Sequence, residues 1–310
     1  MKIVFFGSDD FARAHLESLL ESGFEVVCCV TQPDRSKDRG MKLSISPIKE
    51  CAQEEGISII QPESFDEAIV AALKDFEADL FVVISYGKIL PQEIIDIPKI
   101  CAINVHPSIL PKYRGAAPIN WAIINGDKKT GVSIIKLNLK MDAGDIVSCE
   151  EVDIADEDTA STLRVKTMMI GSGLLKETIG MLENDTCQYM AQEQKSVTLA
   201  PKLTKELGLI DWSQSAVIIN NKVRGLSPWP SAYTYYEGKL FKILDSEVVD
   251  NKQDRSFGEV IEASKSGILV QTKENSLLLK QVQLQGSKEM PAHSFCIGHK
   301  IEVGFKFSNL

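Results

Sequence analysis

The chain has 310 residues, of which 44% are hydrophobic and 25% charged, and its formal net charge is −9. This length favours two domains over one, and the composition is ordinary for a soluble globular protein and excludes a fibrous or disordered chain. No stretch approaches the ~20 apolar residues of a membrane helix, and the apolar start ends at Ser8, too soon for a signal peptide. We therefore expect a cytoplasmic protein without a membrane partner, and the absence of an obvious assembly helix favours a monomer.

The cysteines and histidines show no spacing typical of a disulfide framework or a metal site. Seven cysteines are spread irregularly without a Cys-x-x-Cys pair, and the four histidines form no His-Glu-x-x-His motif. The sequence therefore predicts reduced, mostly buried thiols and no metal.

The charge is unevenly distributed along the chain. Residues 1–200 hold 20 Lys and Arg against 31 Asp and Glu, a balance of −11, whereas residues 201–310 hold 14 against 12, a balance of +2. Segment 31–49 is locally basic, with five Lys and Arg against two Asp, and its composition predicts a loop. Composition alone favours a solvated surface here, but a nucleic-acid partner is not excluded because phosphate binding depends on a local patch.

The first part of the chain alternates expected strands with expected helices. The strands are 2–7, 25–30 and 80–84, and the helices are 11–20, 48–55 and 65–76. Continuous apolar strands separated by helices predict a Rossmann-like, mostly parallel sheet covered on both faces. The first turn lacks the G-x-G-x-x-G pattern, and Asp9 and Asp10 would repel a pyrophosphate, which excludes a dinucleotide cofactor there.

The next expected strand, 102–106, places two polar side chains on one face. Asn104 and His106 alternate with Ile103 and Val105, and side chains two positions apart point the same way in a strand. Pro107 cannot donate a ladder hydrogen bond, so the strand should end at His106. Ligands bind at the carboxyl ends of strands in open α/β sheets, which makes this end a candidate site.

A carboxylate follows a further expected strand around 132–137. The next loop carries Asp142, and Ala143 and Gly144 allow the backbone to approach a bound group closely. From the residues alone two interpretations stay open: Asn104, His106 and Asp142 form turns, or they share one reaction centre.

The remaining sequence predicts a helical segment, a linker and a second domain. We expect a strand at 146–154, a helix at 158–182 and, after residue 209, a helix at 213–223 capped by Ser213. Short strands follow at 232–236, 241–244, 258–262, 267–271, 276–279 and 300–303, and this spacing predicts a small OB-like β-barrel. The expected domains are a Rossmann-like catalytic domain at 1–183, a linker at 184–205 and an OB-like domain at 206–310.

Three motifs resemble the signature of the 10-formyltetrahydrofolate-dependent formyltransferases. They are the runs NVHPSILP at 104–111, RGAAP at 114–118 and MDAGD at 141–145. The RGAAP run, the long C-terminal extension and the Pro-Trp-Pro run around Trp229 resemble the branch of the family that acts on transfer RNA. Two departures stand out: Asp9 replaces a common proline, and Asn120 replaces a common glutamine.

The resemblance implies an activity. A member of this branch would transfer a formyl group from the co-substrate 10-formyltetrahydrofolate to the α-amino group of methionine on initiator transfer RNA, for translation initiation and without a metal. It implies that Asn104 and His106 stabilise the formyl oxygen while Asp142 favours the protonated imidazole and moves a proton from the amine to the folate nitrogen N10.

The resemblance also assigns binding residues. Those expected at the folate are Tyr86, Gly87, Ile89, Leu90, Ser108, Ile109, Leu110, Pro111, Asn138 and Leu139. Those expected at the transfer RNA are Arg39, Lys42, Arg114, Gly115 and Arg224, with Lys222 and Lys239 as further candidates. Trp229 is expected to be a packing anchor.

Two alternatives stay open. The same folate centre would also suit a small amine such as a sugar nucleotide, or hydrolysis of the donor. A protein of another class, a non-catalytic RNA-binding protein, would use only the barrel, and the intact Asn104, His106 and Asp142 argue against it.

Overall fold

The structure, a computed structural model, describes residues 1–37, 42–251, 254–299 and 301–308. The chain forms two compact units: one comprises 1–115, 130–153 and 164–199, and the other 116–129, 154–163 and 200–310. Both units are built from several separate stretches of the chain, so the limits 1–183, 184–205 and 206–310 stay a prediction.

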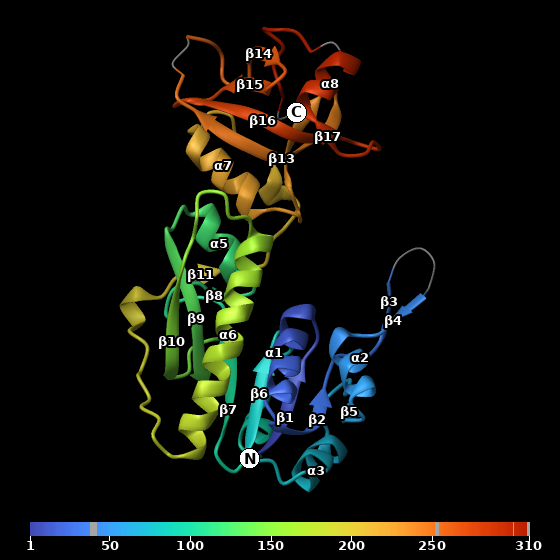
Figure 1. Ribbon diagram of the computed structural model, residues 1–310, viewed down its shortest axis with the longest axis vertical. Coiled ribbons are helices and arrows are strands. Elements are labelled where there is room, and N and C mark those ends of the chain that lie inside the picture. Colours follow the sequence, from blue (N-terminus) through green and yellow to red (C-terminus); the bar gives the residue numbers. More distant parts are fainter. Residues whose placement is uncertain (38–41, 252–253, 300, 309–310) are drawn as a thin grey trace. The chain divides into compact units, whose positions relative to one another are not determined.

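The first unit contains a seven-stranded sheet of order β10-β9-β7-β6-β1-β2-β5 (Figure 1). Its strands are β1 Lys2–Gly7, β2 Glu25–Val30, β5 Ser58–Ile60, β6 Leu80–Ile84, β7 Cys101–His106, β9 Lys129–Lys136 and β10 Ile146–Asp153. Strands β1, β2, β5, β6 and β7 pair in parallel, whereas β9 runs antiparallel to β7. The predicted Rossmann-like, mostly parallel sheet is therefore confirmed.

Side-chain caps fix where the first helices begin. The carboxylate or hydroxyl of Asp9, Ser46 and Asp66 accepts a backbone N–H three residues ahead, which satisfies a donor that the first helical turn leaves unpaired. The helices of this part are α1 Asp10–Glu21, α2 Pro47–Glu54, α3 Glu67–Asp75, α4 Gln92–Ile95 and α6 Ala160–Glu183. The unusual Asp9 thus serves as the N-cap of α1.

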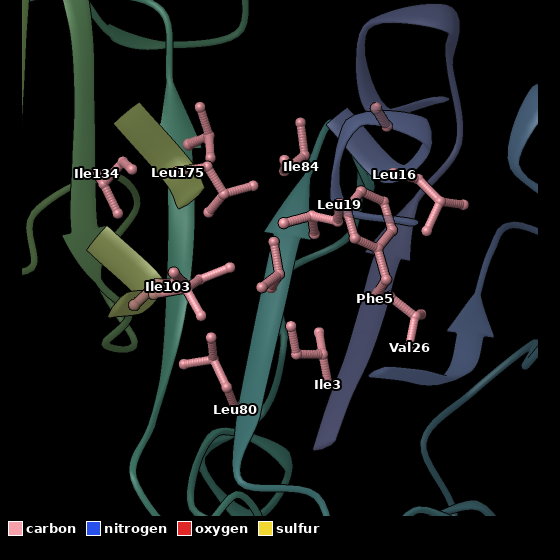
Figure 2. Packing of buried hydrophobic residues seen from close by; sticks show 14 of the residues in the cluster. Ile3, Phe5, Leu16, Leu19, Val26, Leu80, Ile84, Ile103, Ile134 and Leu175 are labelled. Atoms are coloured by element: carbon pink, nitrogen blue, oxygen red, sulfur yellow. The ribbon is translucent and has the colours of Figure 1, made fainter. Parts of the chain in front are cut away.

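Apolar side chains pack against both faces of the sheet. On one face Ile3, Leu80 and Ile103 pack with Leu16 of α1 and Leu175 of α6, all of them fully buried (Figure 2). Burying a side chain of this size contributes about 1.5–3 kcal/mol. The opposite face packs against α3 and α4 through a second cluster, which includes Val4, Phe6, Phe81, Leu73 and Ile94. Because Ile103 belongs to the first face, Asn104 and His106 lie on the second.

The second unit contains an antiparallel sheet of order β12-β13-β16-β15-β14, with β17 paired to β16. Its strands are β12 Ala232–Tyr236, β13 Lys239–Val249, β14 Val260–Ser264, β15 Gly267–Gln271, β16 Ser276–Leu284 and β17 Met290–Pro291. The last segment bridges both edges, since Ser308 pairs with Tyr235 and Lys306 pairs with Glu259. The sheet thereby closes on itself around one core, which agrees with the predicted small barrel.

Shorter elements complete the chain, and two predictions about them are wrong. They are β3 Arg35–Lys37, β4 Lys42–Ser44, β8 Arg114–Gly115, α5 Pro118–Ile124, η1 Gln194–Ser196, β11 Leu199–Ala200, η2 Glu206–Gly208, α7 Ala216–Gly225 and α8 Ala292–His299. Ser215, not Ser213, caps α7, because the Ser213 hydroxyl donates to Asp211 instead. Residues 301–303 of the strand expected at 300–303 form no strand and follow α8. Within the part of the chain that the structure describes, no helix has the length and apolar character needed to cross a membrane.

His15 is a buried imidazole in α1. Its Nδ1 donates to the Phe11 carbonyl at 2.7 Å, since a carbonyl only accepts, and no described residue hydrogen-bonds its Nε2. Burial lowers the pKa of His15 to about 4, while the nearby Asp9 raises it and Arg164 lowers it. The folded protein therefore holds this ring neutral over a pH range in which the unfolded chain protonates it.

This burial predicts a loss of stability in acid. Between pH 6.5 and pH 4 the unfolded state binds a proton that the folded state does not, so the free energy of unfolding falls as the pH falls. From pH 7 to pH 5 this group should lower it by about 1–2 kcal/mol. Urea unfolding at both pH values should show a smaller drop in His15→Leu than in the unmodified protein, and an equal drop would contradict this assignment.

Candidate active site

The carboxyl end of β7 presents the first two groups of the site. Asn104 pairs with Val83 of β6 on one side and Ile135 of β9 on the other, so its backbone is fixed in the sheet. Its side chain is half-buried, and no described residue hydrogen-bonds its amide. The amide is therefore available to a ligand. His106, two residues on, ends the strand, and its side chain is almost fully buried.

The two nitrogens of His106 have different partners. Nε2 lies 2.9 Å from the carbonyl oxygen of Tyr113, and since a carbonyl only accepts, Nε2 carries a proton. Nδ1 lies 3.7 Å from Oδ1 of Asp142. The ring is thus held from one side, and its other nitrogen faces a carboxylate.

Asp142 reaches His106 because its loop is pinned to the end of β9. Its φ of 50° lies in the left-handed region, which costs a non-glycine residue about 1–2 kcal/mol. Oδ2 accepts the backbone N–H of Gly115 at 2.9 Å. A Cβ on Gly144 would lie 1.6 Å from the Lys136 carbonyl oxygen, so only glycine permits this close approach. The structure therefore brings the side chains of His106 and Asp142 together, as a shared reaction centre requires.

The loop after β7 is held by two serines. The Ser133 hydroxyl donates to the Ser108 carbonyl at 2.7 Å and accepts the Leu110 N–H at 3.0 Å. The Ser108 hydroxyl donates to the Lys112 carbonyl at 2.7 Å. Ser108 is therefore occupied within the loop and is not placed as a nucleophile beside His106.

This arrangement suits proton transfer and stabilisation of an oxyanion. An amide donor, an imidazole and a carboxylate lie at one strand end, all within the unit formed by 1–115, 130–153 and 164–199. Among the described residues, no group of three or more His, Cys, Asp or Glu side chains is arranged to hold a metal ion. These groups can polarise a carbonyl and move a proton without a covalent intermediate.

Comparison with known proteins supports this chemistry. A family model described as formyl transferase matches residues 1–179, and one described as formyl transferase, C-terminal domain, matches residues 202–300. This chain belongs to the formyl transferase family. It is therefore a one-carbon transferase, and the family membership expected from the three motifs is confirmed.

Two relatives that match nearly the whole chain carry the same name. The methionyl-tRNA formyltransferase of Alkaliphilus oremlandii is 43% identical over 305 residues, covering 98% of both chains. That of Clostridium tetani is 45% identical over 306 residues, again covering 98% of both chains. A solved N-formyltransferase from Helicobacter canadensis, in complex with folinic acid and dTDP-3-aminofucose, matches with a TM-score of 0.67 over 90% of this chain and 98% of its own. At 19% identity that match shows the fold alone.

The side chains expected at the folate of this formyl transferase differ in their exposure. Tyr86 is 2% exposed and packs edge-on against Phe6, and burial raises the pKa of its hydroxyl to about 12. Leu90 and Leu110 are also buried, whereas Ile89 is 71% exposed. Within 86–90 and 108–111, the buried side chains leave mainly backbone groups for a ligand. Gly87 has a φ of 80°, and Ile109 and Pro111 are half-buried.

The loop after β9 presents the other two expected folate residues. The Asn138 side chain is exposed, and its Oδ1 accepts the Lys140 N–H at 2.9 Å. Leu139 is 56% exposed. With Ile89, Leu139 is one of the two large apolar side chains among these candidates that face solvent.

The basic segment 31–49 is anchored at its base. Lys49 forms an ion pair with Asp34, whose other oxygen accepts from Gln61 Nε2 at 2.8 Å. The hydrogen bond from Lys49 lowers the pKa of Asp34 below its usual value. Two charges of the segment therefore neutralise each other. Arg39 lies outside the described residues, and Lys42 begins β4.

Two of the arginines expected at the RNA are used inside the fold. Arg114 is buried, and its Nε and Nη2 donate to Gln192 Oε1 at 3.0 and 2.7 Å. Arg224 Nη1 donates to the carbonyls of Ala155 and Asp158 at 3.2 and 2.8 Å. Burial lowers the pKa of Arg224. A phosphate would have to compete with these bonds, so neither guanidinium is an open cationic surface.

Of four further residues singled out from the sequence in the second unit, two are hydrogen-bonded inside the fold and two are exposed. Lys222 Nζ donates to the Leu209 carbonyl at 3.0 Å, whereas Lys239 is exposed. Asn120 Nδ2 donates to the Gly225 carbonyl at 2.8 Å, so the amide that replaces a common glutamine is also occupied. Trp229 is 52% exposed, so about half of the residue is covered, and its role as a packing anchor stays a prediction.

Gln192 and Ser133 are functional candidates that the sequence did not reveal. Gln192 donates to two carbonyls of the Asp142 loop, and Ser133 holds the loop after β7. Gln192 is buried, whereas every other residue from 188 to 196 is exposed. No periodicity marks such a residue, because its burial depends on contacts far away in the chain.

The close approach at Gly144 predicts a large effect of adding one methyl group. Gly144→Ala must push the loop away from Lys136, so Asp142 loses its place, and we expect kcat to fall more than tenfold. Gly173→Ala is the matched control, because nothing lies within 4 Å of the added Cβ in α6. That control should keep its activity and stabilise the helix by about 0.5–1 kcal/mol. Equal activity of both variants would contradict the role of this contact.

Proposed function

We propose that this formyl transferase transfers the formyl group of 10-formyltetrahydrofolate to the α-amino group of methionine on initiator methionyl-tRNA. The product would be N-formylmethionyl-tRNA, made in the cytoplasm for translation initiation. The observation that carries this proposal is the contact of His106 Nδ1 with Asp142 Oδ1 at 3.7 Å, beside Asn104. The name shared by relatives at 43% and 45% identity over nearly the whole chain supports the acceptor.

The difficult steps of the reaction take place at the formyl group and not at the attacking amine. An α-amino group has a pKa of roughly 7.7–8.0, so part of it is already neutral near pH 7 and can attack the formyl carbon. Negative charge then develops on the formyl oxygen, and N10 of the folate leaves only after it takes a proton. The site must therefore stabilise an oxyanion and transfer a proton.

In this proposal Asn104 and His106 stabilise the oxyanion. The Asn104 side-chain N–H has no described partner, and a donor of this kind is worth about 2.7–4 kcal/mol in an oxyanion hole. The Nε2 proton of His106 is bound to Tyr113, so only Nδ1 can face the substrate. When the ring is protonated, Nδ1–H lies between Asp142 and the formyl oxygen.

Asp142 serves as the acid–base group. Its Oδ2 is held by the Gly115 N–H, and its Oδ1 faces the reaction centre. It accepts a proton from the attacking amine. That proton then passes through water to N10, so the bond to N10 breaks with a neutral amine as the leaving group.

The substrates are proposed to bind around this centre. The folate would lie against loops 86–90, 108–111 and 138–139, largely through their backbone groups. The transfer RNA would contact Arg39 and Lys42 of the basic segment, and Gly115 next to the catalytic carboxylate.

Arg39→Ala should raise KM for the RNA, because it removes a positive charge proposed to bind the phosphate backbone. Lys74→Ala, at an exposed position of α3, is the control and should leave this KM unchanged. Equal KM values for the two variants would remove Arg39 from the proposal.

An acceptor panel tests the proposed function. With 10-formyltetrahydrofolate as donor, we expect formylation of methionyl-tRNA and none of uncharged RNA, free methionine or an amino sugar nucleotide. Preferential formylation of the amino sugar nucleotide would favour the small-amine alternative. Loss of the formyl group without an acceptor would instead show hydrolysis of the donor.

In the same assay we expect Asn104→Ala, His106→Ala and Asp142→Asn each to lower kcat at least a hundredfold, with KM changed much less. Each variant removes an interaction that the transition state strengthens, and Asn104→Ala alone should raise the barrier by about 2.7–4 kcal/mol. Near-normal turnover of Asp142→Asn would remove the carboxylate from the mechanism.

A further inference from the structure

Gln192 is a buried polar residue that the mechanism above does not use. It is 7% exposed and lies between α6 and η1, in a stretch whose other side chains mostly face solvent. Its burial therefore does not come from an apolar core. The contacts of its amide must explain why this side chain points inward.

All four hydrogen-bonding positions of the Gln192 amide are filled. Nε2 donates to the carbonyl oxygens of Asp142 and Gly144 at 2.9 and 2.7 Å. Oε1 accepts from Nε and Nη2 of Arg114 at 3.0 and 2.7 Å. The orientation of the amide follows from chemistry, because carbonyls only accept and a guanidinium only donates.

These contacts form a closed ring of interactions that includes Asp142. Arg114 precedes Gly115, whose N–H holds Asp142 Oδ2, while Gln192 holds the Asp142 carbonyl and is itself held by Arg114. The Thr198 carbonyl accepts the Arg114 N–H at 2.9 Å, so the segment containing Gln192 is tied to Arg114 a second time. The Gly115 N–H thus fixes the Asp142 side chain, and the Gln192 amide fixes the Asp142 backbone. Arg114 in turn holds the Gln192 amide in place.

The left-handed backbone conformation of Asp142 explains what this ring of interactions does. A residue with a φ of 50° relaxes to another conformation unless its surroundings hold it, and relaxation would turn the carboxylate away from His106. We propose that Gln192, itself held by Arg114, is a positioning residue that keeps Asp142 in this conformation, so that Oδ1 faces His106 Nδ1. This inference rests on the proposed role of Asp142 in formyl transfer.

Gln192→Glu tests the proposal, because it keeps an acceptor for Arg114 but places a carboxylate against the two carbonyls. We expect kcat to fall about 10–100-fold, the range seen when groups that orient metal ligands are lost, with KM for both substrates within about threefold. Gln188→Glu is the matched control, since Gln188 is exposed in the same segment, and it should leave kcat unchanged.

The Asp142→Asn background separates positioning from a general structural role. If Gln192 acts through Asp142, Gln192→Glu should lower kcat by less than about threefold in that background, because effects of residues that act as a unit do not multiply. A full multiplicative loss would overturn the proposal. So would normal turnover of Gln192→Glu beside an impaired Asp142→Asn, whereas a fully active Asp142→Asn would overturn the proposed mechanism itself and this inference with it.

A second variant guards against a folding defect. Gln192→Met keeps the length of the side chain but removes the amide, and it should show the same loss of kcat when assayed well below its melting temperature. If both variants fail to fold, Gln192 serves the stability of the fold, and the positioning role is overturned.

Discussion

The reaction centre depends on one close approach between two backbone segments. Gly144 lies so near the Lys136 carbonyl that a Cβ would reach within 1.6 Å of it, and this contact fixes the loop that carries Asp142 at the end of β9. With the loop fixed, the Gly115 N–H holds one carboxylate oxygen and the other faces His106. A carboxylate on a free loop would sample many positions, and proton transfer requires one.

The sheet supplies the other half of this geometry. Strand β7 is buried on the face of Ile103 and Val105, which places Asn104 and His106 on the opposite face at the carboxyl edge. The loops after β6 and β7 leave the carboxyl edge of these parallel strands, where ligands bind in open α/β sheets, and the loop after the antiparallel β9 brings Asp142 to His106. The apolar core therefore determines where the polar groups act, although it takes no part in the chemistry.

Much of the fold followed from the sequence because its signals are local. Strands β2 and β15 have the bounds that their apolar runs predicted, and the alternation of Asn104 and His106 showed that they share a face. The cap of α7 was misplaced because Ser213 and Ser215 are both suitable caps, and only the contact with Asp211 separates them.

The contacts of the site could not be derived in the same way. The meeting of Asp142 with His106 was expected from the family resemblance, since no periodicity encodes where a loop returns. For the same reason the sequence did not show that Arg114 and Arg224 bind groups within the fold, or that Gln192 is buried. Such contacts join segments far apart in the chain. The sequence alone does not distinguish a basic or polar residue on the surface from one that is hydrogen-bonded inside the fold.

A crystal structure of the enzyme with an unreactive analogue of 10-formyltetrahydrofolate tests the central claim most directly. The account predicts the formyl oxygen within about 3.2 Å of Asn104 Nδ2, with His106 Nδ1 and the Asp142 carboxylate on the same side of the formyl carbon. A formyl group bound away from Asn104, or an Asp142 side chain turned from His106 in that complex, would contradict it.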